Sequence, residues 1–241
     1  GTLYVIAALF NLKVPDTGVD HKALKKNPVY LIHDFTHCLK LLWRDKLGQI
    51  SLATTTLFWG AGATLQFIVI KWAEQALHLD LSKASMLQGV VAVGVAVGAI
   101  LAARMVSMRS SVKVIPLGIA MGVIVNVMIF VTDMSLAMAL MVLIGGLSGF
   151  FVVPMNALLQ HRGHILMGAG HSIAVQNFNE NLSILIMTGL YAFLISSGVS
   201  INTVVVAFGL FVAGTMYMVK RRHDANQREF DSVSELEDVR H

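Results

Sequence analysis

The chain is dominated by long apolar runs that a water-soluble fold could not easily bury. Five of them contain no charged residue, and the remaining one contains only Glu180. The six runs cover residues 47–70, 84–103, 114–132, 134–160, 168–197 and 199–219. Each is long enough to cross a hydrocarbon layer of about 30 Å as a helix of roughly 20 residues. Because the whole sequence is 56% hydrophobic and only 13% charged, we predict an all-α integral membrane protein with six complete transmembrane helices.

The remaining segments predict the rest of the organisation. Residues 1–12 are apolar but too short to span a bilayer, so we interpret them as the end of a truncated transmembrane helix. Residues 13–46 form a linker with an amphipathic helix expected after Asn27, lying in the membrane surface. The six-helix bundle is predicted over 47–219. The charged segment 220–241 is expected to be a frayed cytoplasmic tail.

The basic residues predict the orientation of the chain. If alternate loops lie on opposite sides, 16 of the 18 Lys and Arg residues fall on one side, and only Lys71 and Lys83 fall on the other. By the positive-inside rule the crowded side is cytoplasmic, which places the C-terminus there too. Topology accounts for the basic character of the chain, so we expect no nucleic-acid binding.

The fifth run carries a dense group of polar side chains. On a helical wheel Gln176, Asn179 and Glu180 share one stripe, while Asn177 and Asn181 flank it. Glu180 lies about 18 Å along the helix from its start, deep in the hydrocarbon region. A carboxylate at that depth costs about 2.5–3.5 kcal/mol even on insertion scales. We therefore interpret Glu180 as a functional residue that faces other helices or a cavity.

Two further runs each contain a polar stripe. In the first run it is formed by Thr55, Trp59 and Gln66, and in the fourth by Asn156 and Gln160. For Asn156, Asn177 and Asn181, hydrogen bonding between helices and a functional role both remain open. The predicted substrate or ion path comprises Glu180, Gln176, Asn179, Asn177, Asn181, Gln66, Thr55, Trp59, Asn156 and Gln160.

Spaced glycines predict close helix packing, and the polar groups do not predict catalysis. Gly94 with Gly98 and Gly145 with Gly149 are spaced so that helix backbones can approach each other. Glu180 has no second carboxylate at its depth and no Ser/His/Asp or metal-ligand cluster on its side. We expect no enzyme activity, no catalytic residue, no bound metal and no cofactor, apart from a possible coupling Na⁺ or H⁺.

Three segments carry a family resemblance: "LFWGAGATLQF" (57–67), "GGLSGFFVVPMNALLQHRG" (145–163) and "GAGHSIAVQNFNEN" (168–181). They resemble the bacterial lysophospholipid transporters of the major facilitator superfamily. The resemblance implies the C-terminal half of a twelve-helix protein of the bacterial inner (plasma) membrane. The missing N-terminal half would make the chain a fragment or a split subunit. The resemblance implies that the family's membrane-embedded Glu corresponds to Glu180. It also implies an Arg at the position of Gln66, so this chain lacks that positive charge. Glu180 is then expected to be protonated, bound to a cation or paired with a residue elsewhere.

The resemblance also implies an activity and partners. Such a protein moves lysophospholipids, chiefly lysophosphatidylethanolamine, from the outer to the inner leaflet by alternating access, and the resemblance implies coupling to sodium. A cytoplasmic acyltransferase working with an acyl carrier protein would re-acylate them. The lipid's acyl chain is expected among Phe58, Trp59 and Phe178 or in the bilayer. Two alternatives stay open: an ion-coupled exporter of drugs or other amphiphiles, and a non-transporting scaffold that recruits a cytoplasmic enzyme through residues 27–46.

Overall fold

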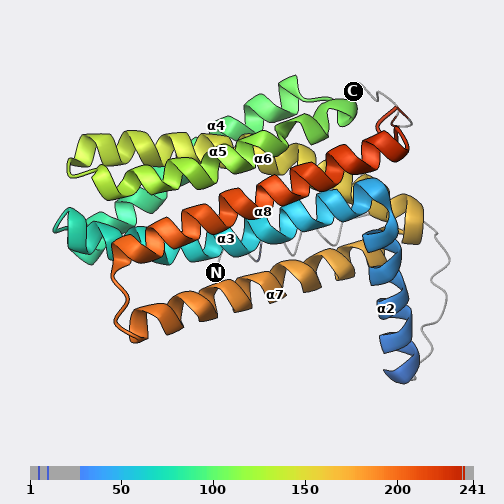
Figure 1. Ribbon diagram of the computed structural model, residues 1–241, viewed down its shortest axis with the longest axis horizontal. Coiled ribbons are helices and arrows are strands. Elements are labelled where there is room, and N and C mark those ends of the chain that lie inside the picture. Colours follow the sequence, from blue (N-terminus) through green and yellow to red (C-terminus); the bar gives the residue numbers. More distant parts are fainter. Residues whose placement is uncertain (1–4, 6–9, 11–27, 235, 237–241) are drawn as a thin grey trace. The chain divides into compact units, whose positions relative to one another are not determined.

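A computed structural model describes residues 5, 10, 28–234 and 236, and within them it contains helices and no strand (Figure 1). The helices are α2 (Pro28–Arg44), α3 (Lys46–Ala76), α4 (Leu81–Met105), η1 (Met108–Val114), α5 (Ile115–Val125), η2 (Asn126–Phe130), α6 (Met134–Met167), α7 (Ala169–Ser196) and α8 (Ile201–Glu229). Six segments are long and apolar enough to cross a membrane: α3, α4, η1 to η2, α6, α7 and α8. The predicted class, an all-α integral membrane protein, is confirmed.

The chain divides into two units, residues 1–34 and 35–241, and the bundle belongs to the second. The predicted amphipathic helix is present as α2, which begins at Pro28. Most of the predicted partial helix at 1–12 lies outside the described residues, as does Asn27.

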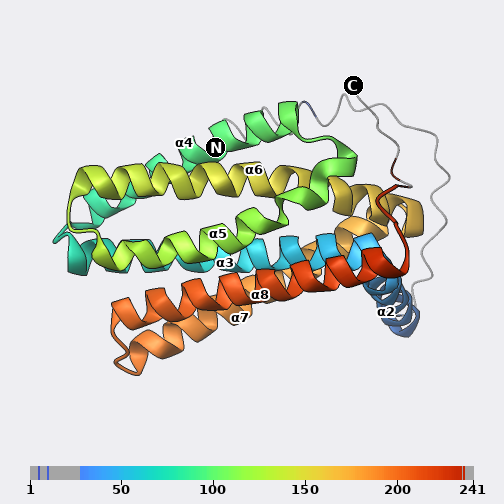
Figure 2. The same ribbon diagram turned by 45° about the horizontal axis from the view of Figure 1, so that its top comes forward.

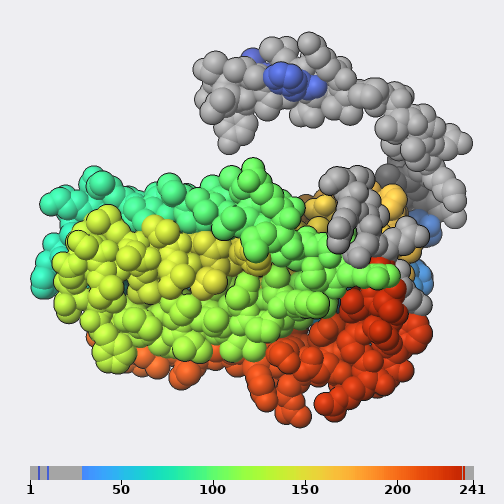
Figure 3. Space-filling model, turned by 90° about the horizontal axis from the view of Figure 1, so that it is seen from above, coloured from blue at the N-terminus to red at the C-terminus, as the bar shows by residue number. Residues whose placement is uncertain are grey.

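Glycine contacts bring α4 and α6 together. A Cβ atom added at Gly98 would lie 1.9 Å from the carbonyl oxygen of Gly146, and one added at Gly149 would lie 2.1 Å from that of Val95. Both obstacles are backbone atoms, so a side chain at either position would force the helices apart. Figure 3 shows the face on which α4, α6 and α5 lie side by side, with α8 beyond α5. The packing predicted from the glycine spacing is therefore confirmed for this pair of helices.

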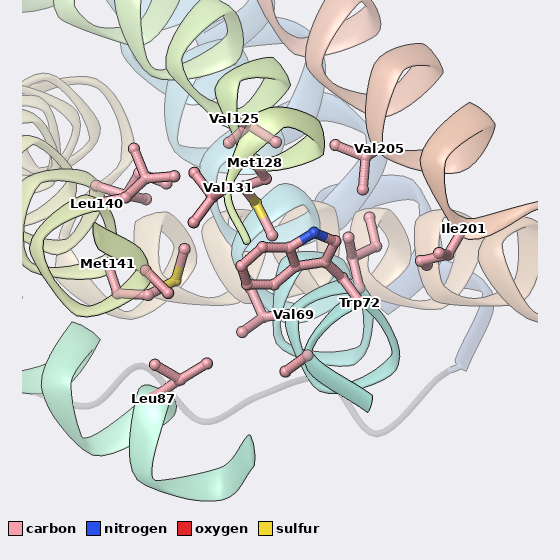
Figure 4. Packing of buried hydrophobic residues seen from close by; sticks show 14 of the residues in the cluster. Val69, Trp72, Leu87, Val125, Met128, Val131, Leu140, Met141, Ile201 and Val205 are labelled. Atoms are coloured by element: carbon pink, nitrogen blue, oxygen red, sulfur yellow. The ribbon is translucent and has the colours of Figure 1, made fainter. Parts of the chain in front are cut away.

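One end of the bundle is closed by an apolar cluster centred on Trp72 of α3 (Figure 4). Leu87, Met128, Met141 and Val205 reach the same cluster from four other helical segments, and every one of them is fully buried. Because these residues come from α3, α4, η2, α6 and α8, the cluster fixes the relative positions of most of the bundle.

An ion pair ties α3 to α6 at the opposite end. Asp45 caps α3 by accepting a hydrogen bond from the Gly48 amide at 2.6 Å. The same carboxylate accepts two hydrogen bonds from the Arg162 guanidinium of α6, from Nε at 3.0 Å and from Nη2 at 2.5 Å. Because the guanidinium makes two hydrogen bonds to one carboxylate, it fixes the relative orientation of α3 and α6 better than a single contact would.

The third span departs from the single helix predicted over 114–132, because α5 ends at Val125 and continues as the 3₁₀ segment η2. The side chain of Asn126 donates to the carbonyl oxygen of Gly122 at 3.0 Å, which is the acceptor that its own backbone amide would use in an α-helix. This local competition explains the change of helix type.

The expectation of a frayed tail after residue 219 is wrong for its first half, because α8 continues to Glu229. Asn226 is buried and donates to the Lys46 carbonyl oxygen at 3.3 Å, and Glu229 pairs with the Lys46 ammonium at 3.1 Å. Arg109 then holds the following turn through the carbonyl oxygens of Ser234 and Leu236. These partners lie far away in the sequence, so local charge patterning could not predict them.

The α4–α6 contact predicts a position-specific effect of one methyl group. Gly98→Ala should destabilise the protein by about 1–3 kcal/mol through overpacking against backbone. Gly89→Ala in the same helix, where nothing lies within 4 Å, should be neutral or stabilising by up to about 1 kcal/mol through helix propensity. Thermal unfolding in detergent measures both variants. Equal stability of the two would show that the close contact of α4 with α6 does not exist.

Candidate functional site

A short chain of hydrogen bonds joins Glu180 to the neighbouring helix. The Gln176 amide donates to the Glu180 carboxylate at 2.8 Å, and it also donates to the Asn156 side-chain oxygen at 3.3 Å. Gln176 and Glu180 lie one turn apart on α7, whereas Asn156 lies on α6. Both α7 residues are 9% exposed. We call Glu180, Gln176 and Asn156 the polar seam.

The surroundings of the polar seam are tightly packed. A Cβ atom added at Gly163 of α6 would lie 1.8 Å from the Ser172 hydroxyl of α7, and one added at Gly60 of α3 would lie 2.1 Å from the Ser183 hydroxyl. Glycines of α6 and α3 thus let α7 approach from two sides. Small residues on the partner helices explain why the polar face of α7 can be buried between them.

The structure separates the predicted site residues into two groups. The buried or half-buried group comprises Glu180, Gln176, Asn156, Asn179 and Thr55, and the exposed group comprises Asn177, Asn181, Gln66, Gln160 and Trp59. Two members of the first group bond to backbone within their own helix: Asn179 to the Val175 carbonyl at 2.8 Å and Thr55 to that of Leu52 at 3.2 Å. The predicted residues are therefore not one continuous cluster.

The exposed amides of α7 lie on a surface that lipid alone would not suit. Only 6% of the most apolar 18-residue window of α7 is buried, against 22–44% in the other five spans. Yet α7 carries Asn177 and Asn181, and among the described residues the Asn181 side chain bonds to the Asn177 carbonyl oxygen of its own helix, at 2.7 Å. The helix that carries these exposed amides is thus the least covered of the six spans.

The carboxylate of Glu180 has no countercharge nearby. Within the described part of the chain it accepts a hydrogen bond from the neutral Gln176 and forms no ion pair. Gln66, where the family resemblance implied an Arg, is exposed on α3, and its carbonyl oxygen accepts from the Gln88 amide at 3.1 Å. A buried acid with only a neutral donor can hold a proton, bind a cation or receive a cationic ligand group.

A groove of about 430 Å³ opens beside α7 between α3, α8 and the end of α2. Asn179 and Ser183 of α7 line it, but Glu180 does not. The groove residues are Trp43, Ala53, Thr56, Leu57, Asn179, Leu182, Ser183, Ile186, Met187, Phe211, Thr215, Met218 and Val219. We call it the α3–α7–α8 groove. Most of its lining is apolar, and this volume falls in the range of about 300–1,000 Å³ that is typical of small-molecule sites.

Sequence reasoning missed this groove. Its polar lining includes Thr56, whose hydroxyl is buried and has no hydrogen-bond partner among the described residues. Phe58, Trp59 and Phe178, the predicted acyl-chain contacts, lie elsewhere: Phe58 packs edge-on against Trp59 at 5.7 Å, and Phe178 against Phe35 at 5.2 Å between ring centroids. The polar lining residues come from three different helices and form no pattern along the sequence, so only the packing of those helices reveals the groove.

The three segments of family resemblance meet in this region. Residues 57–67 lie in α3, 145–163 in α6, and 168–181 in the link to α7 and its first half. They contain the residues of the polar seam and the glycines packed around it. The segments that carry the family resemblance are therefore the ones that form the candidate site.

Comparison with known proteins tests the resemblance. The chain is 40% identical over 203 residues to the protein named Lysophospholipid transporter LplT in Yersinia pestis (strain Pestoides F) and in Yersinia pseudotuberculosis serotype O:3 (strain YPIII). The match covers 84% of this chain and 50% of each relative, so the chain spans about half the length of the curated relatives it matches. No family profile matches the chain, and no solved structure does.

These relatives are named as transporters and not as enzymes, which agrees with the expectation from the sequence. Six membrane-capable helices and this similarity together identify a multi-pass membrane protein. The resemblance predicted from the three segments is therefore confirmed: over 203 residues the chain is homologous to bacterial lysophospholipid transporters.

Proposed function

We propose that this chain forms one half of a secondary transporter that moves lysophospholipids, chiefly lysophosphatidylethanolamine, from the outer to the inner leaflet of the bacterial inner membrane. One observation carries the proposal: Glu180 is buried among membrane helices, and its hydrogen-bond donor is a neutral amide. The ammonium group of the substrate supplies the missing positive charge during transport. The name of the relatives supports this substrate class.

The exposed amides of α7 support a second bundle as the partner of this one. Asn177 and Asn181 face outward at membrane depth, where lipid cannot satisfy their hydrogen bonds. In our proposal a second six-helix bundle, as in the major facilitator superfamily, covers this face and leaves a cavity between the halves. Rocking of the two bundles then exposes the cavity to each side in turn.

The α3–α7–α8 groove suits the acyl chain of the substrate. Its lining is mainly apolar, while Asn179 and Ser183 provide hydrogen-bonding groups at the α7 wall. Asn179 directly precedes Glu180, so a lipid whose chain lies in the groove has its polar part close to the polar seam. This arrangement replaces the aromatic contacts predicted from the sequence.

Orientation, coupling and partners complete the proposal. One end of the bundle carries Lys46, Arg162 and Lys220. Following the positive-inside rule, we propose that this end and the C-terminus lie in the cytoplasm. Na⁺ or H⁺ is the proposed coupling ion, since either can neutralise the Glu180 carboxylate. The family resemblance alone suggests the cytoplasmic acyltransferase and acyl carrier protein as partners.

Removing the charge of Glu180 should stop transport without unfolding the protein. Glu180→Gln keeps an oxygen that can accept the bond from Gln176, but it carries no negative charge for a proton or a cation to neutralise. Uptake of labelled lysophosphatidylethanolamine by spheroplasts should fall by about tenfold or more, a loss of about 1.4 kcal/mol or more in transition-state stabilisation.

The matched control is Glu74→Gln, which makes the same change at an exposed residue paired with Lys71. It should transport normally, and both variants should show the same thermal stability as the wild type. Normal uptake by Glu180→Gln would remove the central assignment. Loss of drug resistance with unchanged lysolipid uptake would favour the amphiphile exporter instead.

Filling the groove should reduce transport according to chain length. Ile186 lines the groove and is 59% exposed, whereas Leu190, one turn further on, is 56% exposed and is not part of the lining. Ile186→Trp should lower uptake of long-chain lysolipids by about tenfold and that of short-chain ones less. Leu190→Trp serves as the control, and equal effects of the two substitutions would place the acyl chain elsewhere.

A further inference from the structure

A second pocket, of about 300 Å³, lies where the start of α5 meets the end of α8. Figure 3 shows the green segment before α5 directly against the red last turns of α8. The pocket is lined by Val112, Lys113, Ile115, Pro116, Lys220, His223 and Asp224. It shares no lining residue with the α3–α7–α8 groove and contains no residue of the polar seam. It is therefore a separate site.

The charges in this pocket leave a net positive surplus. Lys220 is paired with Asp224 at 2.7 Å, one helical turn away. Lys113 is exposed and forms no ion pair within the described part of the chain. Since the local carboxylate is already taken up by Lys220, the Lys113 ammonium is available to an outside anion.

An unsatisfied histidine nitrogen lies in the same pocket. The Nδ1 atom of His223 is buried and has no hydrogen-bond partner among the described residues. Leaving a buried polar atom without a partner is costly, so a site of this kind favours a ligand that supplies one. A neutral or protonated imidazole can donate from Nδ1 to a phosphate oxygen.

The position of the pocket suggests where an anion comes from. Lys220 is the first charged residue after the apolar run of α8, and it lies one turn after Tyr217, which is 54% exposed. An exposed Tyr followed by Lys is typical of the boundary between the hydrocarbon core and the headgroups. Basic pockets between helices at this level suit the headgroups of anionic lipids.

We propose that the pocket formed by Lys113, Lys220 and His223 binds the phosphate of an anionic phospholipid from the surrounding leaflet. Lys113 and Lys220 contribute charge, and His223 donates a directed hydrogen bond. Asp224 holds the Lys220 ammonium in place. The bound lipid fastens the end of α8 to the start of α5. This site is distinct from the transport path, and its existence does not depend on the identity of the transported lipid.

Lipid titration followed by native mass spectrometry tests the proposal on the detergent-purified protein. Phosphatidylglycerol is compared with zwitterionic phosphatidylcholine and with inorganic phosphate. Lys113→Gln and His223→Leu remove two proposed contacts. Arg221→Gln removes one positive charge from an exposed neighbour that does not line the pocket. Circular dichroism confirms that each variant remains folded.

We expect phosphatidylglycerol to bind about tenfold more tightly than phosphatidylcholine, and Lys113→Gln to abolish that difference. His223→Leu should weaken binding severalfold, while Arg221→Gln should change it by less than about twofold. If Lys113→Gln and Arg221→Gln weakened phosphatidylglycerol binding equally, the proposal would be overturned in favour of nonspecific electrostatic attraction. Inorganic phosphate binding as tightly as the lipid would overturn the assignment of a lipid ligand. Failure of this test leaves the Glu180 transport test unaffected, because the two use different residues and readouts.

Discussion

A carboxylate held among membrane helices without a countercharge is the constraint on which this account depends. In hydrocarbon an ionised group needs a cation, a proton or water, and in the part of the chain that the structure describes Glu180 accepts a hydrogen bond from the neutral amide of Gln176 and forms no ion pair. The seam exists because glycines on α3 and α6 bring both helices against α7. Close backbone packing and an incompletely satisfied acid thus occur together. In the proposed transporter this combination lets a rigid frame present a group whose partner changes during the cycle.

The polar side chains of α7 differ in their exposure. Gln176 and Glu180 are buried, and Gln176 bonds to Asn156 of α6, whereas Asn177 and Asn181 are exposed although they are their immediate neighbours in the sequence. A helix rotated by half a turn would expose the acid and bury the amides. The observed rotation keeps the acid within the frame and offers neutral amides to whatever covers the helix. In the proposed transporter this is the cavity between two bundles, with the α3–α7–α8 groove as a lateral apolar extension.

The sequence predicted the spans well because their lengths and apolar composition are local properties. It also predicted that Gln176 and Glu180 share a face, since four residues make about one helical turn. It did not predict which neighbouring helix covers that face, and so it could not separate half-buried Asn156 and buried Gln176 from exposed Asn177, Gln66 and Gln160. The extension of α8 to Glu229 was missed for the same reason, because Lys46 and Arg109 stabilise it from distant parts of the chain. Thr56 and the groove it lines likewise follow from packing and not from pattern.

Water accessibility at position 181 tests the central claim most directly. Cys38 is the sole cysteine of the sequence, so Asn181→Cys in a Cys38→Ala background carries one reactive thiol. If α7 lines a cavity, a membrane-impermeant maleimide should label this thiol, and lysophosphatidylethanolamine should slow the labelling. Phe193 is 65% exposed on the same helix. A Phe193→Cys thiol should stay unlabelled if this position faces lipid. If the Asn181→Cys thiol were labelled as slowly as the thiol at position 193, with or without lysophosphatidylethanolamine, the account would be contradicted.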